Sequence, residues 1–203
     1  MTTISIIGSG NMATAIGTRA AKHGHTVEIL SRNTAKAHAL ADQIGSGATV
    51  GTFGAKPAGD IVIVAILYAD AVDVVAQFGD SLTDKILVDI TNPFNADASG
   101  VVTTPGHSVT EQIAAVTPQS THVVKAFNTI FGGVIAEDQP LDVFFAGDST
   151  EAKARVAAFL ESMGMRPLDA GALGMAHALE WAGILLVGLA NNGVGFDIAL
   201  GVK

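Results

Sequence analysis

The stretch from Ile4 to Ala13 reads ISIIGSGNMA, and it decides the fold. A short apolar strand runs into a glycine turn, and a helical pattern continues from the turn to His23. A second strand pattern follows at residues 26–32. Strand, turn, helix and strand in this order form a βαβ unit, and the turn carries the dinucleotide fingerprint G-x-G-x-x-A. The stretch therefore predicts a Rossmann-type α/β fold that binds a dinucleotide.

Each small residue of the fingerprint has a physical task. Gly8 permits the tight turn, Gly10 lets the backbone approach a pyrophosphate, and Ala13 lets the helix pack closely on the strand. Free N–H groups at the start of the helix, together with the positive end of its dipole, hold the phosphates. A glycine turn with a purely structural role is the alternative. The flanking strand, helix and strand favour the dinucleotide site.

The end of the second strand indicates which dinucleotide is bound. An NAD site places Asp or Glu there to accept hydrogen bonds from the ribose 2′-OH. This chain has Ser31, Arg32 and Asn33 instead, with Lys36 one helical turn further on. A guanidinium and an ammonium can pair with a 2′-phosphate, and no carboxylate in this segment repels it. NADP(H) is therefore the predicted cofactor, with a solvated basic loop as the alternative.

Composition limits the number of domains, the classes of partner and the cellular location that we expect. A chain of 203 residues with 49% hydrophobic and 15% charged residues suits one α/β domain, 1–203, whose sheet is covered on both faces. The net charge of −8 argues against nucleic acid and anionic membranes as partners. Without Cys there is no disulfide framework and no cysteine metal site. Because the first strand begins by Ile4, we expect no signal peptide and a cytoplasmic protein.

The pattern after Lys36 predicts a doubly wound, mostly parallel sheet. Further strands are expected at 49–50, 61–67, 85–91, 121–127, 141–146 and 165–169. Helices are expected at 35–44, 68–78, 108–116 and 150–163. Ser108 and Glu111 form a capping-box pattern, and Ser149 is a candidate N-cap. The continuous apolar run at 61–67 is typical of a parallel strand buried on both faces.

The last predicted element is an apolar helix at 173–191. His177, Glu180 and Asn191 are its main polar residues. The run from Trp181 to Ala190 has only ten apolar residues, which is too short to span a bilayer. A helix that is apolar on all sides must be buried. We expect it to form a homodimer interface or a lid over the pocket, in preference to simple core packing.

Ligands of doubly wound sheets bind beyond the carboxyl ends of the strands. In this chain those ends are rich in backbone, amide and apolar groups and poor in acids and bases. Such a site can hold two flat rings face to face but offers little for proton transfer. Hydride transfer between two rings needs mainly proximity, alignment and exclusion of water. We therefore expect no catalytic acid or base, and Thr91, Asn92, Asn128 and Thr129 would orient the rings.

The other titratable residues give little evidence for a metal site or a catalytic site. The six His show no metal-ligand spacing, so no metal site is predicted. His177 and Glu180 are three residues apart, and a helix-surface pair is expected there in preference to a catalytic pair. Lys125 lies inside a strand, and its ammonium is expected either to reach the surface or to reach the pocket.

A resemblance accompanies these motifs. Gly8 to Met12, Ser31-Arg32 with Lys36, Lys125 to Ile130 and Arg166 to Gly171 together resemble the NADPH-dependent deazaflavin (coenzyme F-420) reductase family. The cytosolic oxidoreductase domain of the six-transmembrane ferric reductases is similar too. The resemblance covers essentially the whole chain. It implies a pocket in which NADPH meets a second ring, that of a deazaflavin (coenzyme F-420), FMN or FAD.

The resemblance also implies the site residues. Those expected to bind NADP(H) are Gly8, Ser9, Gly10, Asn11, Met12, Ser31, Arg32, Lys36, Ile66, Asn92 and Gly132. Those expected to face the second ring are Asn128, Thr129, Ile130 and Phe131. Deazaflavin reductases often carry His where this chain has Asn128, whereas the ferric reductases are more like this chain at that position. The identity of the second ring therefore stays open.

Two alternatives remain to hydride transfer between NADPH and a small-molecule redox partner of flavin type. One is an NADPH-dependent reductase of a small carbonyl or imine. Hydroxyacid dehydrogenases, however, need a lysine on the long helix after the sheet, and residues 167–202 contain none. The other is an NADP(H)-sensing module without turnover, because a hydride-transfer site can lack a diagnostic acid or base.

Overall fold

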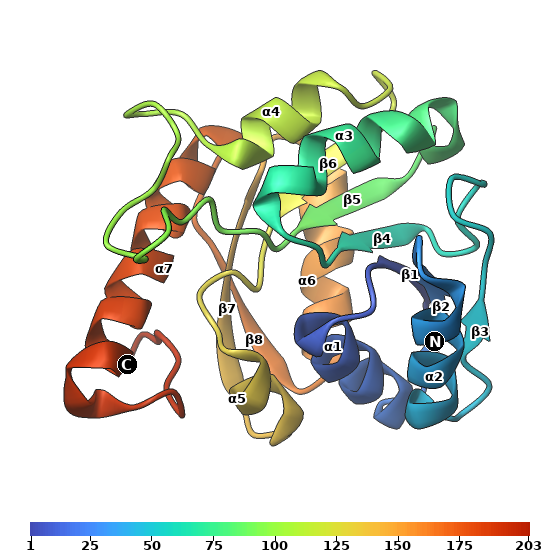
Figure 1. The fold of residues 1–203 in the computed structure, drawn as a ribbon, viewed down its shortest axis with the longest axis horizontal. Helices are drawn as coiled ribbons and strands as arrows, with labels where there is room; N and C mark the ends of the chain where they lie inside the picture. The colour runs from blue at the N-terminus through green and yellow to red at the C-terminus, as the bar shows by residue number, and fades with distance from the viewer.

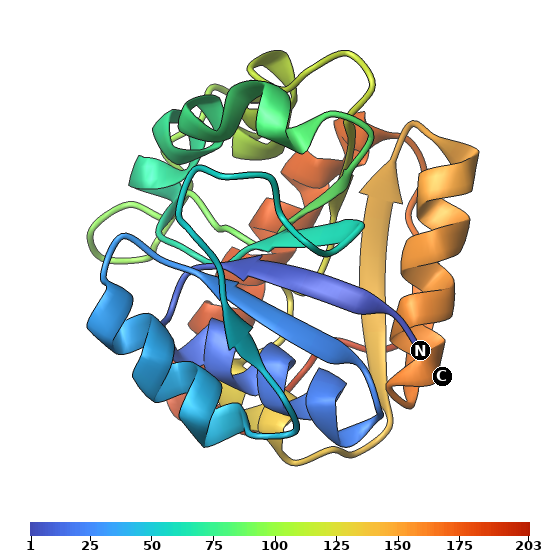
Figure 2. The same cartoon turned by 90° about the vertical axis from the view of Figure 1, so that its right-hand side faces the viewer.

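The computed structural model describes residues 1–203, and one eight-stranded sheet runs through its middle (Figures 1 and 2). Its strands are β1 (Thr3–Ile7), β2 (Thr26–Leu30), β3 (Thr49–Val50), β4 (Ile61–Val64), β5 (Ile86–Asp89), β6 (His122–Lys125), β7 (Leu141–Gly147) and β8 (Met165–Asp169). Their order across the sheet is β3-β2-β1-β4-β5-β6-β7-β8. All neighbours are parallel except β6 and β7, which are antiparallel. The predicted Rossmann-type, mostly parallel sheet is confirmed.

Helices cover both faces of this sheet (Figure 2). They are α1 (Asn11–Lys22), α2 (Thr34–Ile44), α3 (Tyr68–Phe78), α4 (Val109–Ala115), α5 (Gly132–Ala136), α6 (Thr150–Ser162) and α7 (Ala176–Leu189). Short 3-10 turns lie at Gly79–Leu82 and Leu173–Met175, and a π turn at Ala190–Val194 extends α7. The predicted capping box is confirmed, since the Ser108 hydroxyl accepts from Glu111 N–H at 3.1 Å and the Glu111 carboxylate accepts from Ser108 N–H at 2.8 Å.

The alternation of side chains along the strands divides the core into two layers. In β4, Ile61 and Ile63 pack in the layer that contains α1, α2 and α6, whereas Val62 and Val64 pack in the layer that contains α3 and α4. Both faces of the strand are therefore apolar, which explains the unbroken apolar run in the sequence. Figure 1 shows α3 and α4 above the sheet and α1, α2, α5 and α6 below it.

Several elements differ from the sequence predictions, and one of them is the strand predicted at 85–91, which spans only Ile86–Asp89. The strand predicted at 61–67 ends at Val64, because the chain turns at Ala65 beneath the glycine turn and α3 begins at Tyr68. Helix α5 was not expected, since Gly132 and Gly133 open it and glycine disfavours helix. The strand predicted at 121–127 likewise stops at Lys125.

The apolar C-terminal helix is confirmed and is longer than its ten-residue apolar run indicated. It stands beside β7 and α4 at one side of the molecule (Figure 1). The helical stretch at 173–194 has a mean hydropathy of 1.6 over its most apolar window, of which 39% is buried. By length and composition alone it is sufficient to cross a membrane, so the expectation that it is too short is wrong. A half-buried helix of a soluble protein satisfies the same criterion.

Candidate functional site: two adjoining cavities at the strand ends

A cleft of about 620 Å³ lies at the carboxyl ends of β1, β2, β4 and β5. Ten of the eleven residues predicted to bind NADP(H) line it, namely Gly8, Ser9, Gly10, Asn11, Met12, Ser31, Arg32, Lys36, Ile66 and Asn92. Tyr68, at the strand end where ligands were expected, also lines the cleft, together with Phe53 and Asp70, which were not expected there. These three come from the β3–β4 loop and from α3, so only the folded chain brings them to the fingerprint.

The glycine turn is shaped for close approach. Gly8 has φ +134°, and a Cβ on it would lie 2.1 Å from the carbonyl oxygen of Ala65. Only glycine fits there, because the conformation and the space both exclude a side chain. Gly10 precedes α1 without a side-chain cap, and a Cβ there would meet no atom within 4 Å. The first N–H groups of α1 therefore face open space, which fits a pyrophosphate.

The far end of the cleft holds the charged groups. Lys36 lies in the first turn of α2, where Asn33 caps the helix by accepting from Lys36 N–H at 3.0 Å. The Arg32 guanidinium lies 2.5 Å from the Asp70 carboxylate. The expectation that no carboxylate lies near a 2′-phosphate therefore holds for the β2 end alone, since α3 supplies Asp70 from a distant part of the sequence. Two cations and one anion line this end.

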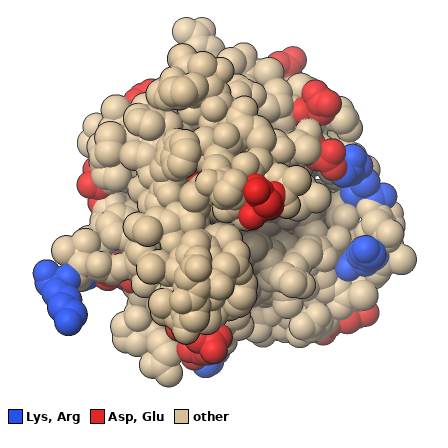
Figure 3. Space-filling view, turned by 60° about the vertical axis from the view of Figure 1, so that its left-hand side comes forward, with Lys and Arg blue, Asp and Glu red and all other residues tan.

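A second cavity of about 290 Å³ adjoins the first. Its lining residues are Asn11, Met12, Ile90, Asn92, Phe94, Phe127, Asn128, Ile130, Phe131, Gly132, Gly183, Leu186 and Val187. The first four also line the cleft. None of the thirteen is titratable, so this cavity offers amide and apolar groups only. Figure 3 shows a face with few charged side chains and a hollow beside a group of basic ones.

The remaining predicted residues are distributed between this cavity and the core. Asn128, Ile130 and Phe131, expected at the second ring, line the second cavity. Gly132, expected at the nicotinamide, lines the second cavity and not the cleft. Thr129, expected at the second ring, lines neither cavity and is fully buried, so this part of the prediction does not hold.

An amide pair connects the two cavities. Asn92 Nδ2 donates to Asn128 O at 2.8 Å, and Asn128 Nδ2 donates to Asn92 Oδ1 at 2.9 Å and to Leu179 O at 2.7 Å. Since both bonds of Asn128 Nδ2 end on acceptors, the orientation of this amide is fixed. Its Oδ1 is buried and has no partner. Asn128 therefore lines the second cavity and carries one oxygen that no protein group uses and that is covered in this structure.

Helix α7 closes the second cavity through a glycine. A Cβ on Gly183 would lie 2.8 Å from Asn92 Oδ1, so α7 approaches this side chain as closely as glycine allows. Leu186 and Val187, on the next turn, complete the apolar wall. The inner face of the helix thus lines the cavity, and its role as a lid or a dimer interface stays a prediction.

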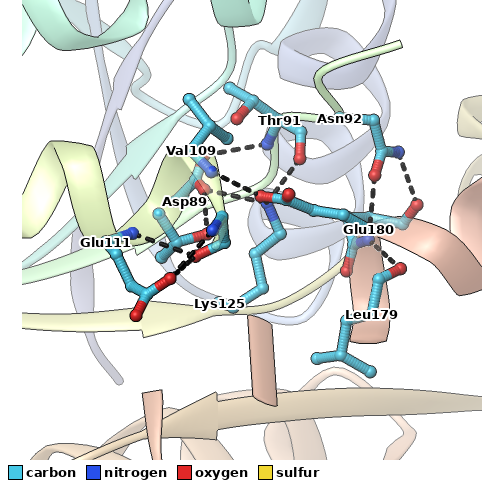
Figure 4. Close-up of polar contacts among 11 residues, drawn as sticks. Asp89, Thr91, Asn92, Val109, Glu111, Lys125, Leu179 and Glu180 are labelled. Carbon is cyan, nitrogen blue, oxygen red and sulfur yellow. Dashed lines mark hydrogen bonds and ion pairs between the residues drawn. The ribbon is translucent and has the colours of Figure 1, made fainter. Parts of the chain in front are cut away.

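The main feature that the sequence did not reveal is a group of buried charges beside Thr91 and Asn92, two residues that line the cleft (Figure 4). Lys125, Asp89 and Glu180 are all fully buried. Lys125 Nζ lies 2.9 Å from Asp89 Oδ2 and 3.4 Å from Glu180 Oε1. The ammonium of Lys125 therefore reaches neither the surface nor the pocket. The expected surface pair of Glu180 with His177 is also wrong, because Glu180 points inward and His177 Nδ1 contacts Gly174 O at 2.5 Å.

Comparisons with known proteins agree with this geometry. Residues 3–93 match the family described as NADP oxidoreductase coenzyme F420-dependent. The metalloreductase STEAP3 of Rattus norvegicus is 30% identical over 180 residues, 87% of this chain, and the chain spans 35% of that protein. The F420-dependent NADP reductase of Methanothermobacter thermautotrophicus is 26% identical over 206 residues, which cover 92% of this chain and 88% of that protein.

The predicted resemblance is confirmed. Residues 3–93 match the F420-dependent NADP oxidoreductases, and nearly the whole chain is similar to an F420-dependent NADP reductase. A putative F420-dependent NADP-reductase from Arthrobacter sp. FB24 shares the fold over the whole of both chains, with a TM-score of 0.87 and 22% identity. An imine reductase from Myxococcus stipitatus has a TM-score of 0.71 and 20% identity over 95% of this chain and 62% of that one. At these identities the two structures show the fold alone.

Proposed function

We propose that this chain transfers a hydride from NADPH, bound in the cleft, to a flavin-type or deazaflavin ring in the second cavity. The observation that supports this best is the shared wall. Asn11, Met12, Ile90 and Asn92 line both cavities, so ligands in the two cavities lie side by side. Hydride transfer requires reacting atoms roughly 3–3.5 Å apart. Two adjoining cavities with apolar walls would let the two rings approach to this distance and would limit the water between them.

The chain's own residues would bind and align the two rings. The free N–H groups after Gly10 would hold the pyrophosphate, and Arg32 with Lys36 would pair with the 2′-phosphate. NADPH supplies the hydride when bound. Asn128 Oδ1 would accept a hydrogen bond from an N–H group of the second ring and so set its orientation. Because no titratable side chain lines the second cavity, we propose transfer without an obligatory protein acid or base.

The size and polarity of the second cavity favour recognition of the ring over recognition of its substituents. At about 290 Å³ the cavity lies at the small end of ligand sites. No cation lines it, so a polyanionic tail of a deazaflavin would extend into solvent. Deazaflavin coenzyme F-420, FMN and FAD all present a tricyclic ring, in which the atom that accepts the hydride is carbon in the deazaflavin and nitrogen in FMN and FAD, so all three are candidates.

The proposal is tested by mixing the purified protein with NADPH and, in turn, deazaflavin coenzyme F-420, FMN, FAD, a ferric chelate and a cyclic imine. Oxidation of NADPH is followed by absorbance. Turnover with a tricyclic ring is the expected result. Turnover with the cyclic imine alone would favour the reductase of a small carbonyl or imine, whose fold this chain shares with the imine reductases. NADPH binding without any turnover would favour a sensing module.

We also propose that the protein is a cytoplasmic homodimer built on the outer face of α7. Trp181, Leu185 and Leu189 are spaced four residues apart on this helix and are 49%, 56% and 40% exposed. Phe196, just after the helix, is 55% exposed. A second copy is the simplest cover for such a stripe, since C₂ dimers are the commonest closed assembly. Light scattering at micromolar concentration should give twice 20.6 kDa, and a monomer would contradict the proposal.

A further inference from the structure

The buried charges behind the two cavities come from three separate elements. Asp89 ends β5 and Lys125 ends β6, and the two residues face each other in the parallel ladder. Glu180 comes from the second turn of α7. The side chains meet where the two strands end and the cavities begin (Figure 4). Each is 0% exposed, so bulk solvent does not reach the contacts among them.

The first task of this group is to hold the backbone of Thr91. Asp89 Oδ1 accepts from Thr91 N–H at 2.9 Å, and Lys125 Nζ donates to Thr91 O at 2.5 Å. Both backbone groups of Thr91 therefore bond to side chains, at the point where the chain leaves the sheet. Thr91 and the next residue, Asn92, line the cofactor cleft. The position of this turn thus depends on two buried charges.

The second task is to fix helix α7 along the sheet. Glu180 Oε1 accepts from Val109 N–H at 3.0 Å and lies 3.4 Å from Lys125 Nζ. One turn further along the helix, Gly183 lies against Asn92 with no room for a Cβ. A shift of α7 by a few tenths of an ångström would therefore move Asn92 and the wall of the second cavity.

Burying three charged side chains is an energetically unfavourable way to stabilise a fold. Removing three charges from water costs free energy, and apolar residues of similar volume are often as stabilising. Two carboxylates face a single ammonium, and Glu180 Oε2 has no partner. Burial raises the pKa of Glu180, although the Lys125 ammonium opposes this effect. Placement beside two cavities accounts for the group better than stability does.

We propose that Lys125, Asp89 and Glu180 are positioning residues that fix the Thr91–Asn92 turn and helix α7 relative to each other. The nicotinamide end of the cleft and the second cavity then keep one mutual geometry. This inference goes beyond the proposed hydride transfer. It rests on the proposed function only in the experiment that measures NADPH binding.

Four variants test it: Lys125→Met, Glu180→Ala, Glu180→Gln and the control Glu161→Gln. Lys125→Met removes the donor to Thr91 O, and Glu180→Ala removes the acceptor of Val109 N–H. Glu180→Gln keeps Oε1 and both of its contacts, and so serves as the conservative rescue. Glu161 is exposed on α6, so its change alters charge alone.

The first measurement is amide hydrogen exchange by NMR in the ligand-free protein. In Lys125→Met the Thr91 amide should exchange at least tenfold faster, and in Glu180→Ala the Val109 amide should do so. Amides of β1 and β2 should stay unchanged in both variants. In Glu180→Gln the exchange rate of the Val109 amide should stay within threefold of its rate in the unmodified protein. Uniform acceleration over the whole sheet, or equal damage from Gln and Ala, would overturn the proposal.

The second measurement compares NADPH with 2′,5′-ADP, which carries the 2′-phosphate but no nicotinamide. The ratio of the Kd for 2′,5′-ADP to the Kd for NADPH should fall at least fivefold in Lys125→Met and Glu180→Ala. It should stay constant in Glu180→Gln and in the control Glu161→Gln. Equal weakening of both ligands would contradict positioning of the nicotinamide end. If Lys125→Met does not fold, the comparison of Glu180→Ala with Glu180→Gln decides whether the positioning role holds. If the unmodified protein binds neither ligand, the proposed function fails while the exchange measurement still tests the positioning role.

Discussion

The cofactor cleft and the second cavity are neighbours in space but are built in opposite ways. The cleft takes most of its polar groups from residues 8–36, a continuous segment that holds the glycine turn, α1, β2 and the first residues of α2. The second cavity takes its lining from four segments, at 11–12, 90–94, 127–132 and 183–187. The cleft carries charges that fit phosphates, whereas the second cavity carries amides and apolar groups. The cleft can thus be predicted from local pattern, whereas the lining of the second cavity was expected only from the strand-end rule and the resemblance, which found Asn128, Ile130 and Phe131 but not Gly183 and Leu186.

The largest expected effect concerns the glycine turn of the cleft. Gly8→Ala should destabilise the fold by about 3 kcal/mol or more, because the new Cβ would meet the Ala65 carbonyl and the positive φ would be strained. Gly10→Ala is the matched control for stability, since a Cβ there meets no atom within 4 Å. It should fold normally but bind NADPH poorly. Thermal unfolding and calorimetry measure the two effects, and equal unfolding temperatures for the two variants would contradict this account of the turn.

The second cavity has its own test on α7. Gly183→Ala should cost about 1–3 kcal/mol through overpacking against Asn92 and should raise the KM for the hydride acceptor. Its affinity for 2′,5′-ADP should not change, because that ligand would occupy only the charged end of the cleft. Gly188→Ala, on the same helix with open space around its Cβ, should stabilise the protein by about 0.5–1 kcal/mol. Similar behaviour of the two variants would show that α7 does not control the cavity.

The cofactor choice of the cleft depends on Arg32. Arg32→Ala should weaken NADPH by about 1.5 kcal/mol, roughly tenfold, and leave NADH nearly unchanged. This is the low end for a charge-assisted contact, because Arg32 is exposed and must leave Asp70 to reach a phosphate. Calorimetric titration with each dinucleotide measures it. Equal affinities of the unmodified protein for NADPH and NADH would remove the basis of the prediction.

The smallest expected effect concerns Asp70, at the same charged end of the cleft. Asp70→Asn should strengthen NADPH binding by about 0.2–1 kcal/mol, since an exposed ion pair is worth that much and the variant releases Arg32 for the phosphate. NADH binding should stay the same. Asp73→Asn, with the same change in charge at an exposed position of α3 outside the cleft, is the control. Weaker NADPH binding in Asp70→Asn would mean that Asp70 orients Arg32 and does not compete for it.

Local pattern was sufficient to predict most of the fold. The apolar run in β4, the fingerprint and the Ser108 capping box each act within a few residues, so sequence shows them directly. Asp70, Lys125 and Glu180 illustrate what sequence could not show. Lys125 has the same local pattern whether its ammonium reaches solvent or a buried carboxylate, and only the pairing of β5 with β6 and the packing of α7 decide between them.

The central claim is that hydride passes directly from NADPH in the cleft to a ring in the second cavity. NADPH deuterated at the transferred position tests it most directly, with a deazaflavin as acceptor because the carbon of the reduced ring retains the label. The predicted result is deuterium in the reduced deazaflavin, with His177→Ala lowering the rate by far less than the roughly 10²–10⁴-fold typical of a lost acid or base. Loss of the label to solvent before transfer, or a thousandfold defect in His177→Ala, would contradict the claim.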